Sequence, residues 1–152
     1  MGSVLMEKST NEQMTELRII IAGSRDFNDY EYLSDVLTIF IKEHPNRRFV
    51  VVSGTARGAD QLGEKFAREN SIPIKRFPPD WDNLGKRAGY IRNSQMLDYI
   101  NQPDCEGYVF AFWDGESRGT QHMIKSAQKA GISVEIFYHK KIQSNSKKNV
   151  DK

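Results

Sequence analysis

The sequence has very little of what disulfide-bonded, zinc-binding or membrane-spanning proteins need. Its 152 residues contain a single cysteine, Cys105, which cannot form a disulfide within the chain or complete a zinc-binding cysteine pair. The longest apolar runs, such as 108–113, are far shorter than the roughly 20 residues that cross a bilayer. The polar N-terminus also lacks the apolar core of a secretory signal. We therefore expect a cytoplasmic protein with no metal site and no contact with a membrane.

Sequence motifs of the common nucleotide enzymes are also missing. No Gly-Lys-Ser/Thr follows Gly58 or Gly119, so the chain has no P-loop. The first apolar run is not followed by G-x-G-x-x-G, and Gly54 and Gly58 are spaced differently from that fingerprint. Hydride transfer with a nicotinamide cofactor therefore lacks its usual sequence support, and we predict no bound cofactor.

Positive charge is scarce outside the C-terminal end. The whole chain has a formal charge of +2, but segment 139–152 has five lysines against Asp151, and the segment 17–138 has no net charge. A duplex-binding domain needs a basic face on its fold. Nucleic-acid binding is therefore only the third of the functions that we consider, and it is based on the lysine tail and the aromatic residues. It predicts a gel shift that is lost when residues 139–152 are deleted.

What is present divides the chain into three parts. Segment 1–16 is polar and has no apolar periodicity, so we predict a disordered leader. Segment 17–138 has the length and the alternating apolar pattern of one folded domain, and segment 139–152 is predicted to be a basic, disordered tail.

Five short apolar runs alternate with amphipathic stretches in the segment 17–138. We expect strands at 17–22, 48–52, 72–77, 108–113 and 134–138, with helices at about 29–43, 59–70, 90–100 and 121–130. Segment 78–89 is rich in proline, glycine and aspartate and is predicted to be a long functional loop. This order predicts an α/β three-layer sandwich with a mainly parallel five-stranded sheet.

The most informative stretch is Ser53–Asp60, which joins the second expected strand to a helix. A strand that ends in Ser-Gly and enters a helix through Gly58 is expected to leave backbone N–H groups aimed outward, where a phosphate or carboxylate can bind. The exits of the first and fourth strands have similar Gly, Ser, Thr, Arg and Asp residues. Each could be an ordinary turn, but three in one sheet favour an anion site, most simply for a nucleotide phosphate.

The candidate ligand-binding residues follow from these exits and from the long loop. At the strand exits they are Gly23, Ser24, Arg25, Gly54, Thr55, Arg57, Gly58, Asp114, Ser117, Gly119 and Thr120. In and beside the loop they are Trp81, Lys86, Arg92 and Asn93. Arg92 is the best candidate there for a phosphate or ribose contact, and Trp81 for stacking on a base. The alternatives are a solvated arginine and a packing tryptophan.

Three carboxylates near the strand exits are candidate catalytic residues. An enzyme that hydrolyses an N-glycosidic bond needs one of them, Asp60, Asp80 or Asp114, to activate water or stabilise an oxocarbenium ion. For Asp60 the favoured alternative is to cap or charge a helix N-terminus. His122 is expected to be structural, because no second histidine or cysteine is placed to share a metal.

Five motifs in order give the chain a family resemblance. They are Gly23–Phe27, Ser53–Asp60, Phe77–Trp81, Gly85–Asn93 and Phe112–Thr120. Together they resemble the YspA/YpsA-related branch of the SLOG superfamily, found in bacteria and their phages. The resemblance implies a Rossmann-like fold over 17–138, a nucleotide or nucleotide-derived ligand, and a homo-oligomer of two or more chains.

The same resemblance bears on activity. SLOG domains are related to the Lonely Guy phosphoribohydrolases, which release a base from a nucleoside monophosphate and use a glutamate in their second glycine motif. Met123 stands at that position here, and a thioether can neither act as a base nor stabilise a cation by charge. Other SLOG domains sense NAD-derived signals in antiphage defence. We therefore favour a sensor or sequestering protein over an enzyme, with an N-glycosidic hydrolase as the alternative.

Overall fold

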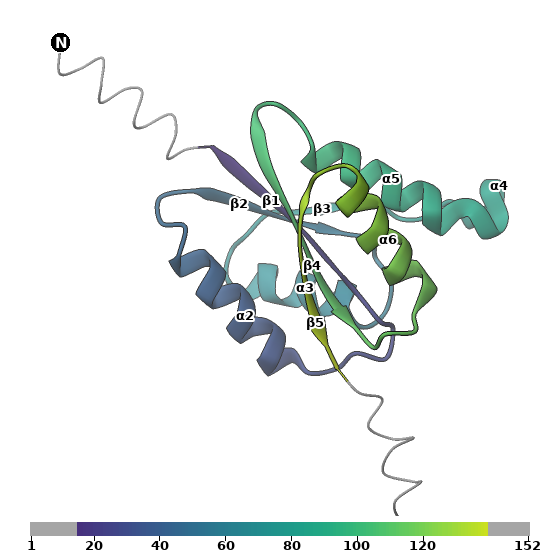
Figure 1. Cartoon of the computed structure of the whole chain (residues 1–152). Coiled ribbons are helices and arrows are strands. Elements are labelled where there is room, and N and C mark those ends of the chain that lie inside the picture. Colours follow the sequence, from purple (N-terminus) through teal and green to yellow (C-terminus); the bar gives the residue numbers. More distant parts are fainter. Residues whose placement is uncertain (1–14, 140–152) are drawn as a thin grey trace, which may run out of the picture.

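A sheet of five parallel strands, in the order β3-β2-β1-β4-β5, forms the centre of the protein. The computed structural model describes residues 15–139 (Figure 1). The strands are β1 (Glu16–Gly23), β2 (Arg48–Ser53), β3 (Ile74–Arg76), β4 (Cys105–Trp113) and β5 (Ser133–Tyr138). The parallel five-stranded sheet confirms the α/β fold that the alternating pattern predicts.

The helices connect these strands in chain order. They are α2 (Tyr30–Lys42), α3 (Ala59–Glu69), α4 (Trp81–Leu84), α5 (Ala88–Ile100) and α6 (Arg118–Lys129), with a 3-10 turn, η1 (Gly85–Arg87), between α4 and α5. Helix α2 begins at an aspartate cap, since the carboxylate of Asp29 accepts the backbone N–H of Tyr32 at 3.1 Å. None of the helices within 15–139 combines the length and the apolar character that crossing a bilayer requires.

Two apolar clusters attach the helices to opposite faces of the sheet. In the first, Leu33 and Leu37 of α2 and Phe66 of α3 pack with Ile19 and Ile21 of β1. Burying each such side chain stabilises the fold by about 1.5–3 kcal/mol. The other cluster joins α5 and α6 to the opposite face through Met96, Ile100, Met123, Ile20 and Val109. Figure 1 shows the resulting three layers, which make the fold Rossmann-like.

The strand order reverses between β1 and β4, and this reversal places the site. The chain leaves β1 toward α2 on one face of the sheet, and it leaves β4 toward α6 on the other face. The two exits therefore diverge and leave a crevice between them at the carboxyl ends of the strands, which is where open α/β sheets bind ligands.

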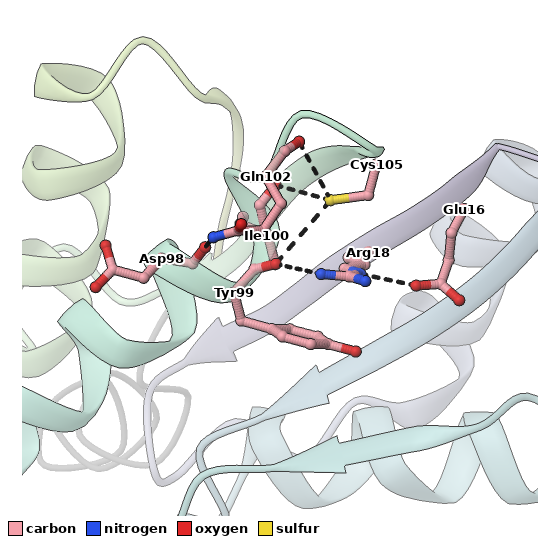
Figure 2. Close-up of polar contacts among 7 residues, drawn as sticks. All are labelled: Glu16, Arg18, Asp98, Tyr99, Ile100, Gln102 and Cys105. Atoms are coloured by element: carbon pink, nitrogen blue, oxygen red, sulfur yellow. Dashed lines mark hydrogen bonds and ion pairs between the residues drawn. The ribbon is translucent and has the colours of Figure 1, made fainter.

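The opposite end of the sheet is fixed by Arg18 of β1 (Figure 2). Its guanidinium donates hydrogen bonds to Glu16 Oε1 at 2.7 Å and to the carbonyl of Tyr99 at 2.6 Å, and it lies 4.1 Å from the centre of the Tyr99 ring. The thiol of Cys105 lies 3.5 Å from the carbonyl oxygen of Ile100. These contacts tie the end of α5 to β1 and β4.

The predicted long loop at 78–89 is largely helical instead. The carboxylate of Asp80 accepts the backbone N–H of Asn83 at 3.3 Å and caps α4, and Gly85, with φ of 59°, ends it. Helix α5 then begins at Ala88, two residues before the predicted start. None of the residues of α4 and η1 is buried, so this segment lies on the surface of the fold.

Other boundaries differ from prediction by a few residues. Strand β4 begins at Cys105, because Glu16–Arg18 extends the pairing of β1 with it. Glu16 therefore belongs to the sheet rather than to the predicted leader. His139 donates its backbone N–H to the carbonyl of Trp113 at 3.0 Å, so His139 bonds to the sheet although it belongs to the predicted tail. The rest of both predicted terminal segments lies outside the described residues.

Candidate ligand-binding site

A cleft of about 490 Å³ lies where β1 and β4 end, at the reversal of strand order. Pockets of this size hold small-molecule ligands. Its walls come from the exit of β1, the first turns of α3 and α5, and the connection from β4 into α6. The lining residues are Ala22, Gly23, Ser24, Arg25, Asp26, Ala56, Asp60, Arg92, Asn93, Met96, Asp114, Glu116, Ser117, Gly119, Thr120 and Met123.

Many of the residues singled out from the sequence meet in this cleft. From the candidate ligand-binding set it brings together Gly23, Ser24, Arg25, Arg92, Asn93, Asp114, Ser117, Gly119 and Thr120, and it adds the candidate catalytic residue Asp60. The candidates that do not line it are Gly54, Thr55, Arg57, Gly58, Asp80, Trp81 and Lys86. The predicted site therefore forms around the exits of β1 and β4, while the exit of β2 has a different role.

Ser24 joins the exits of β1 and β4. Its side chain is buried, its backbone N–H donates to the carbonyl of Phe112 at 3.0 Å, and its hydroxyl oxygen accepts the backbone N–H of Asp114 at 3.1 Å. The carbonyl of Ser24 also accepts the backbone N–H of Phe27 at 3.1 Å. Ser24 thus holds the floor of the cleft in shape, because its backbone N–H and its hydroxyl oxygen both bond to the exit of β4.

Gly58 allows the exit of β2 to pack closely on the exit of β1. It has φ of 80°, and a Cβ atom there would lie 2.2 Å from the carbonyl oxygen of Ser24 and 2.6 Å from that of Arg25. No side chain fits at that distance, and L-residues rarely adopt that backbone conformation. Gly58 is therefore required by backbone packing and not by contact with a ligand.

Three backbone donors at the exit of β2 already have acceptors within the protein. The N–H of Thr55 donates to Ser53 Oγ at 3.0 Å, and the N–H of Ala56 donates to Asp60 Oδ2 at 3.1 Å. The N–H of Ala59 donates to the carbonyl of Ser24 at 3.4 Å. Three of the N–H groups that the Ser53–Asp60 stretch was expected to offer to a phosphate are therefore already bonded within the protein, two of them to side chains of the same stretch.

The N-terminus of α6, in contrast, opens into the cleft. Asp114 Oδ1 accepts the N–H groups of Glu116 and Ser117, both at 2.8 Å, and this turn starts the helix three residues before its predicted start. The next three N–H groups, of residues 118–120, have no acceptor within the described part of the chain. Free donors at a helix N-terminus, together with the helix dipole, favour an anion.

Gly119 leaves that end of α6 uncovered. A Cβ atom at Gly119 would meet no atom within 4 Å, and its backbone is not in the left-handed region. Neither packing nor conformation therefore requires glycine here, although glycine in a helix costs up to about 1 kcal/mol relative to alanine. Its position in the cleft lining leaves room for close approach of a bound molecule.

Arg92 and Asn93, at the start of α5, bridge the two sides of the cleft. The guanidinium of Arg92 donates to the carbonyl of Gly54 and, at 3.0 Å, to Asn93 Oδ1. The Asn93 amide donates to the carbonyl of Gly119 at 3.3 Å and lies 3.1 Å from His122 Nδ1. Burial lowers the pKa of Arg92, yet an arginine keeps its charge in proteins, so the cleft has a fixed cation here.

Gly54 makes room for this arginine. A Cβ atom at Gly54 would lie 2.6 Å from Arg92 Nη1 and 2.9 Å from Asp60 Oδ2. The absence of a side chain therefore lets the guanidinium and the carboxylate approach the same point from two different helices. Gly54 belongs to the site through these neighbours, and not through contact with the cleft itself.

Asp60 is the most perturbed carboxyl group of the site. It lies in the first turn of α3, with 6% of its surface exposed, and its Oδ2 accepts the N–H of Ala56. Burial raises its pKa to about 7, although the Ala56 hydrogen bond and the charge of Arg92 favour the ionised form. Of the three aspartates proposed as catalytic, Asp80 caps α4 outside the cleft, and Asp114 holds the turn before α6 by accepting the N–H groups of Glu116 and Ser117. Only Asp60 combines burial, a place in the cleft and titration near neutral pH.

The remaining predicted loop residues lie on the surface. Trp81 is 49% exposed and Lys86 is exposed, and neither lines the cleft. Arg57 is exposed as well, and Thr55 lines a separate, smaller depression with Gln61, Glu64, Arg68 and Arg76. A stacking role for Trp81 therefore finds no support in the shape of the cleft.

Sequence reasoning missed five lining residues, Ala22, Asp26, Ala56, Met96 and Glu116, whereas Met123 had been singled out through the family resemblance. Asp26 and Glu116 could have been predicted, because both lie in the strand exits from which the site was inferred. Met96 had no such signal, because its position on α5 resembles that of a core residue. Within 15–139 no cluster of three or more His, Cys, Asp or Glu side chains is arranged to hold a metal ion.

Comparison with known proteins places the chain in a family. Residues 17–83 match the sequence profile of the YspA, cpYpsA-related SLOG family. The chain is also similar to the Gene 61 protein of Mycobacterium phage D29, with 36% identity over 125 residues that cover 79% of this chain and 95% of the phage protein. The matched segment contains the exits of β1 and β2 and the Asp80-capped turn, in the order that the resemblance requires. The chain therefore belongs to the YspA, cpYpsA-related SLOG family.

Proposed function

We propose that residues 17–138 form a nucleotide-binding domain whose cleft binds a nucleotide or a nucleotide-derived small molecule, as a sensor or a sequestering protein. The observation that carries this proposal is the uncovered N-terminus of α6 at Gly119, which opens into a cleft of about 490 Å³. Membership of the SLOG family supports a nucleotide-related ligand. An NAD-derived signal in antiphage defence is the more specific form of the proposal.

In this proposal a ligand phosphate lies at the start of α6. The N–H groups of residues 118–120 supply donors, and the guanidinium groups of Arg25 and Arg92 supply positive charge from the other walls. Hydrogen bonds between charged groups and phosphate are about twice as strong as neutral ones. Gly119 allows the phosphate to approach the helix backbone directly.

The residues that line the cleft favour binding of the ligand without its chemical conversion. Met123, the residue at the position of the related hydrolases' glutamate, is 1% exposed and lines the cleft on α6. A thioether there adds apolar contact but no charge and no proton. We therefore propose that the cleft retains its ligand chemically intact.

Isothermal titration calorimetry tests the proposal, with adenosine 5′-monophosphate, NAD, ADP-ribose and cyclic ADP-ribose isomers as ligands. We expect at least one to bind with one site per chain, and Arg25→Ala to weaken that binding at least tenfold. Arg48→Ala is the matched control, since Arg48 is exposed at the opposite end of the sheet. Absence of binding by every ligand, or equal loss in both variants, would overturn the proposal. Mass spectrometry of the small molecule that copurifies with the protein would identify the physiological ligand.

Hydrolysis of an N-glycosidic bond is the second candidate function, and Asp60 is the observation that favours it. A carboxyl group with a pKa of about 7 can donate a proton to a leaving base or accept one from water at neutral pH. This candidate predicts free base and ribose phosphate after incubation with a nucleoside monophosphate, and loss of turnover in Asp60→Asn. Recovery of intact ligand after heat denaturation would exclude it.

The proposal also covers the cellular compartment, the oligomeric state and the binding of nucleic acid. We place the protein in the cytoplasm, because a lone cysteine suits a reducing compartment. We propose a homo-oligomer of at least two chains, which light scattering measures directly. A nucleic-acid partner is disfavoured, and a gel shift at low salt that deletion of 139–152 abolishes would reverse that judgement.

A further inference from the structure

The cleft has more negative than positive groups, which is unexpected for a site that holds a phosphate. Its lining includes four carboxylates, those of Asp26, Asp60, Asp114 and Glu116, and two guanidinium groups, those of Arg25 and Arg92. A bound phosphate adds further negative charge at short range, in a place partly shielded from water. Like charges in that setting raise each other's affinity for protons.

Asp60 is the carboxylate least able to remain charged beside such a ligand. Only 6% of the surface of Asp60 is exposed, so the side chain is almost fully buried. Asp26 and Glu116, in contrast, are exposed, and Asp114 stabilises the turn before α6. One oxygen of Asp60, Oδ2, accepts the N–H of Ala56. The other, Oδ1, has no hydrogen-bond partner within the described residues, and the side chain lines the cleft.

The charged groups around Asp60 do not neutralise it by direct pairing. Arg92 of α5 approaches it beside Gly54, but donates its hydrogen bonds to the Gly54 carbonyl and to Asn93. Arg25, in the connection from β1, acts on Asp60 only through its charge. Glu64, one turn further along α3, adds a negative charge that opposes ionisation of Asp60.

We propose that ligand binding in this cleft is coupled to protonation of Asp60, whose neutral carboxyl group donates a hydrogen bond from Oδ1 to an anionic oxygen of the ligand. The inference rests on the proposed function of the cleft. Both partners are acceptors while Asp60 is ionised, so a favourable contact between them requires one proton. Solvent supplies that proton, and each ligand bound above neutral pH takes up one. Because the pKa of Asp60 is about 7, protonating it near neutral pH requires little free energy.

Calorimetry at pH 6 and pH 8, in two buffers of different ionisation enthalpy, measures the coupling. ADP-ribose is one probe, because its diphosphate diester loses no proton in this range, and adenosine 5′-monophosphate is the other. For ADP-ribose and an Asp60 pKa of about 7, we expect affinity to fall about tenfold from pH 6 to pH 8, with uptake of close to one proton at pH 8.

Two variants isolate Asp60. Asp60→Asn has a permanent neutral donor, so we expect it to bind at pH 8 about as tightly as the wild type binds at pH 6, with no uptake by residue 60. Asp98→Asn, at an exposed position of α5, is expected to keep the wild-type pH dependence. Circular dichroism confirms that both variants are folded.

The possible results separate this inference from the proposed function. Binding that is independent of pH in the wild type, or an unchanged pH dependence in Asp60→Asn, overturns the proton coupling and leaves the ligand site intact. Affinity that requires Mg²⁺ and is lost with EDTA also overturns it, because a metal ion would then neutralise the cleft. Absence of binding by both probes at both pH values overturns the proposed function, and the coupling with it.

Discussion

Replacing Asp60 by asparagine should change how the stability of the protein depends on pH. Burial raises the Asp60 pKa from 3.8 to about 7, so the folded protein holds this proton more tightly than the unfolded chain does. The stabilising contribution is then fully present below pH 4, and it is lost as pH rises through 7. A shift of roughly three pKa units corresponds to about 4 kcal/mol, since each unit is worth about 1.4 kcal/mol.

Only part of this loss falls in a convenient pH range. With these two pKa values, the wild type loses about 2–3 kcal/mol of unfolding free energy between pH 5 and pH 8 through Asp60. Asp60→Asn cannot lose that contribution, because its amide does not titrate. Its side-chain oxygen can still accept the N–H of Ala56, so the local turn is preserved.

Urea unfolding followed by circular dichroism gives the comparison directly. Both proteins are measured at pH 5 and pH 8, and the difference between them removes the contributions of all other titrating groups. We expect the unfolding free energy of Asp60→Asn, relative to the wild type, to rise by about 2–3 kcal/mol from pH 5 to pH 8. A difference that is the same at both pH values would show that Asp60 does not titrate abnormally, and would refute the electrostatic reasoning.

Three further substitutions test the frame of the cleft. Gly58→Ala should destabilise the fold by about 1–3 kcal/mol or more, because its Cβ would lie 2.2 Å from the Ser24 carbonyl oxygen at a φ of 80°. Thermal unfolding measures this loss, and an unchanged melting temperature would contradict it. Ser24→Ala should cost about 1–3 kcal/mol by leaving the Asp114 N–H without its acceptor, also measured by urea unfolding. Arg57→Ala should leave calorimetric affinity within about twofold, since Arg57 does not line the cleft; a tenfold loss would restore the site predicted from the Ser53–Asp60 stretch alone.

The sequence was sufficient to predict the sheet and the end of it that forms the cleft. Runs such as Leu17–Ala22 are apolar on both faces, which is typical of parallel strands covered by helices on each side. The polar exits of β1 and β4 follow those runs immediately, so residues such as Arg25 and Ser117 could be assigned to one edge.

The roles at the exit of β2 could not be predicted in the same way. Whether the N–H groups of Thr55 and Ala56 are free depends on acceptors at the end of β2 and the start of α3, and the position of Arg92 depends on how α5 packs. Trp81 and Lys86 were misplaced because the Asp80 cap turns the predicted loop into a surface helix. The Arg92 contact joins residues 38 positions apart and is decided by the assembled fold, whereas the Ser53, Asp60 and Asp80 contacts join residues two to four positions apart and are local signals that the prediction did not use.

Gly119 offers the most direct test of the claim that the cleft is a ligand site. The fold does not require glycine there, so Gly119→Ala should leave the protein folded and as stable as the wild type, or up to about 1 kcal/mol more stable. Its methyl group, however, would project into the space that we assign to a ligand phosphate. Gly89→Ala is the matched control, because Gly89 is likewise the second residue of a helix, α5, has only ordinary contacts and does not line the cleft.

The decisive measurement is calorimetric titration of these two variants and the wild type with the tightest-binding nucleotide of the panel. We predict at least a tenfold loss of affinity in Gly119→Ala, corresponding to about 1.4 kcal/mol or more, with affinity unchanged in Gly89→Ala. Wild-type affinity in Gly119→Ala would contradict the account, because the start of α6 would then not be where the ligand binds.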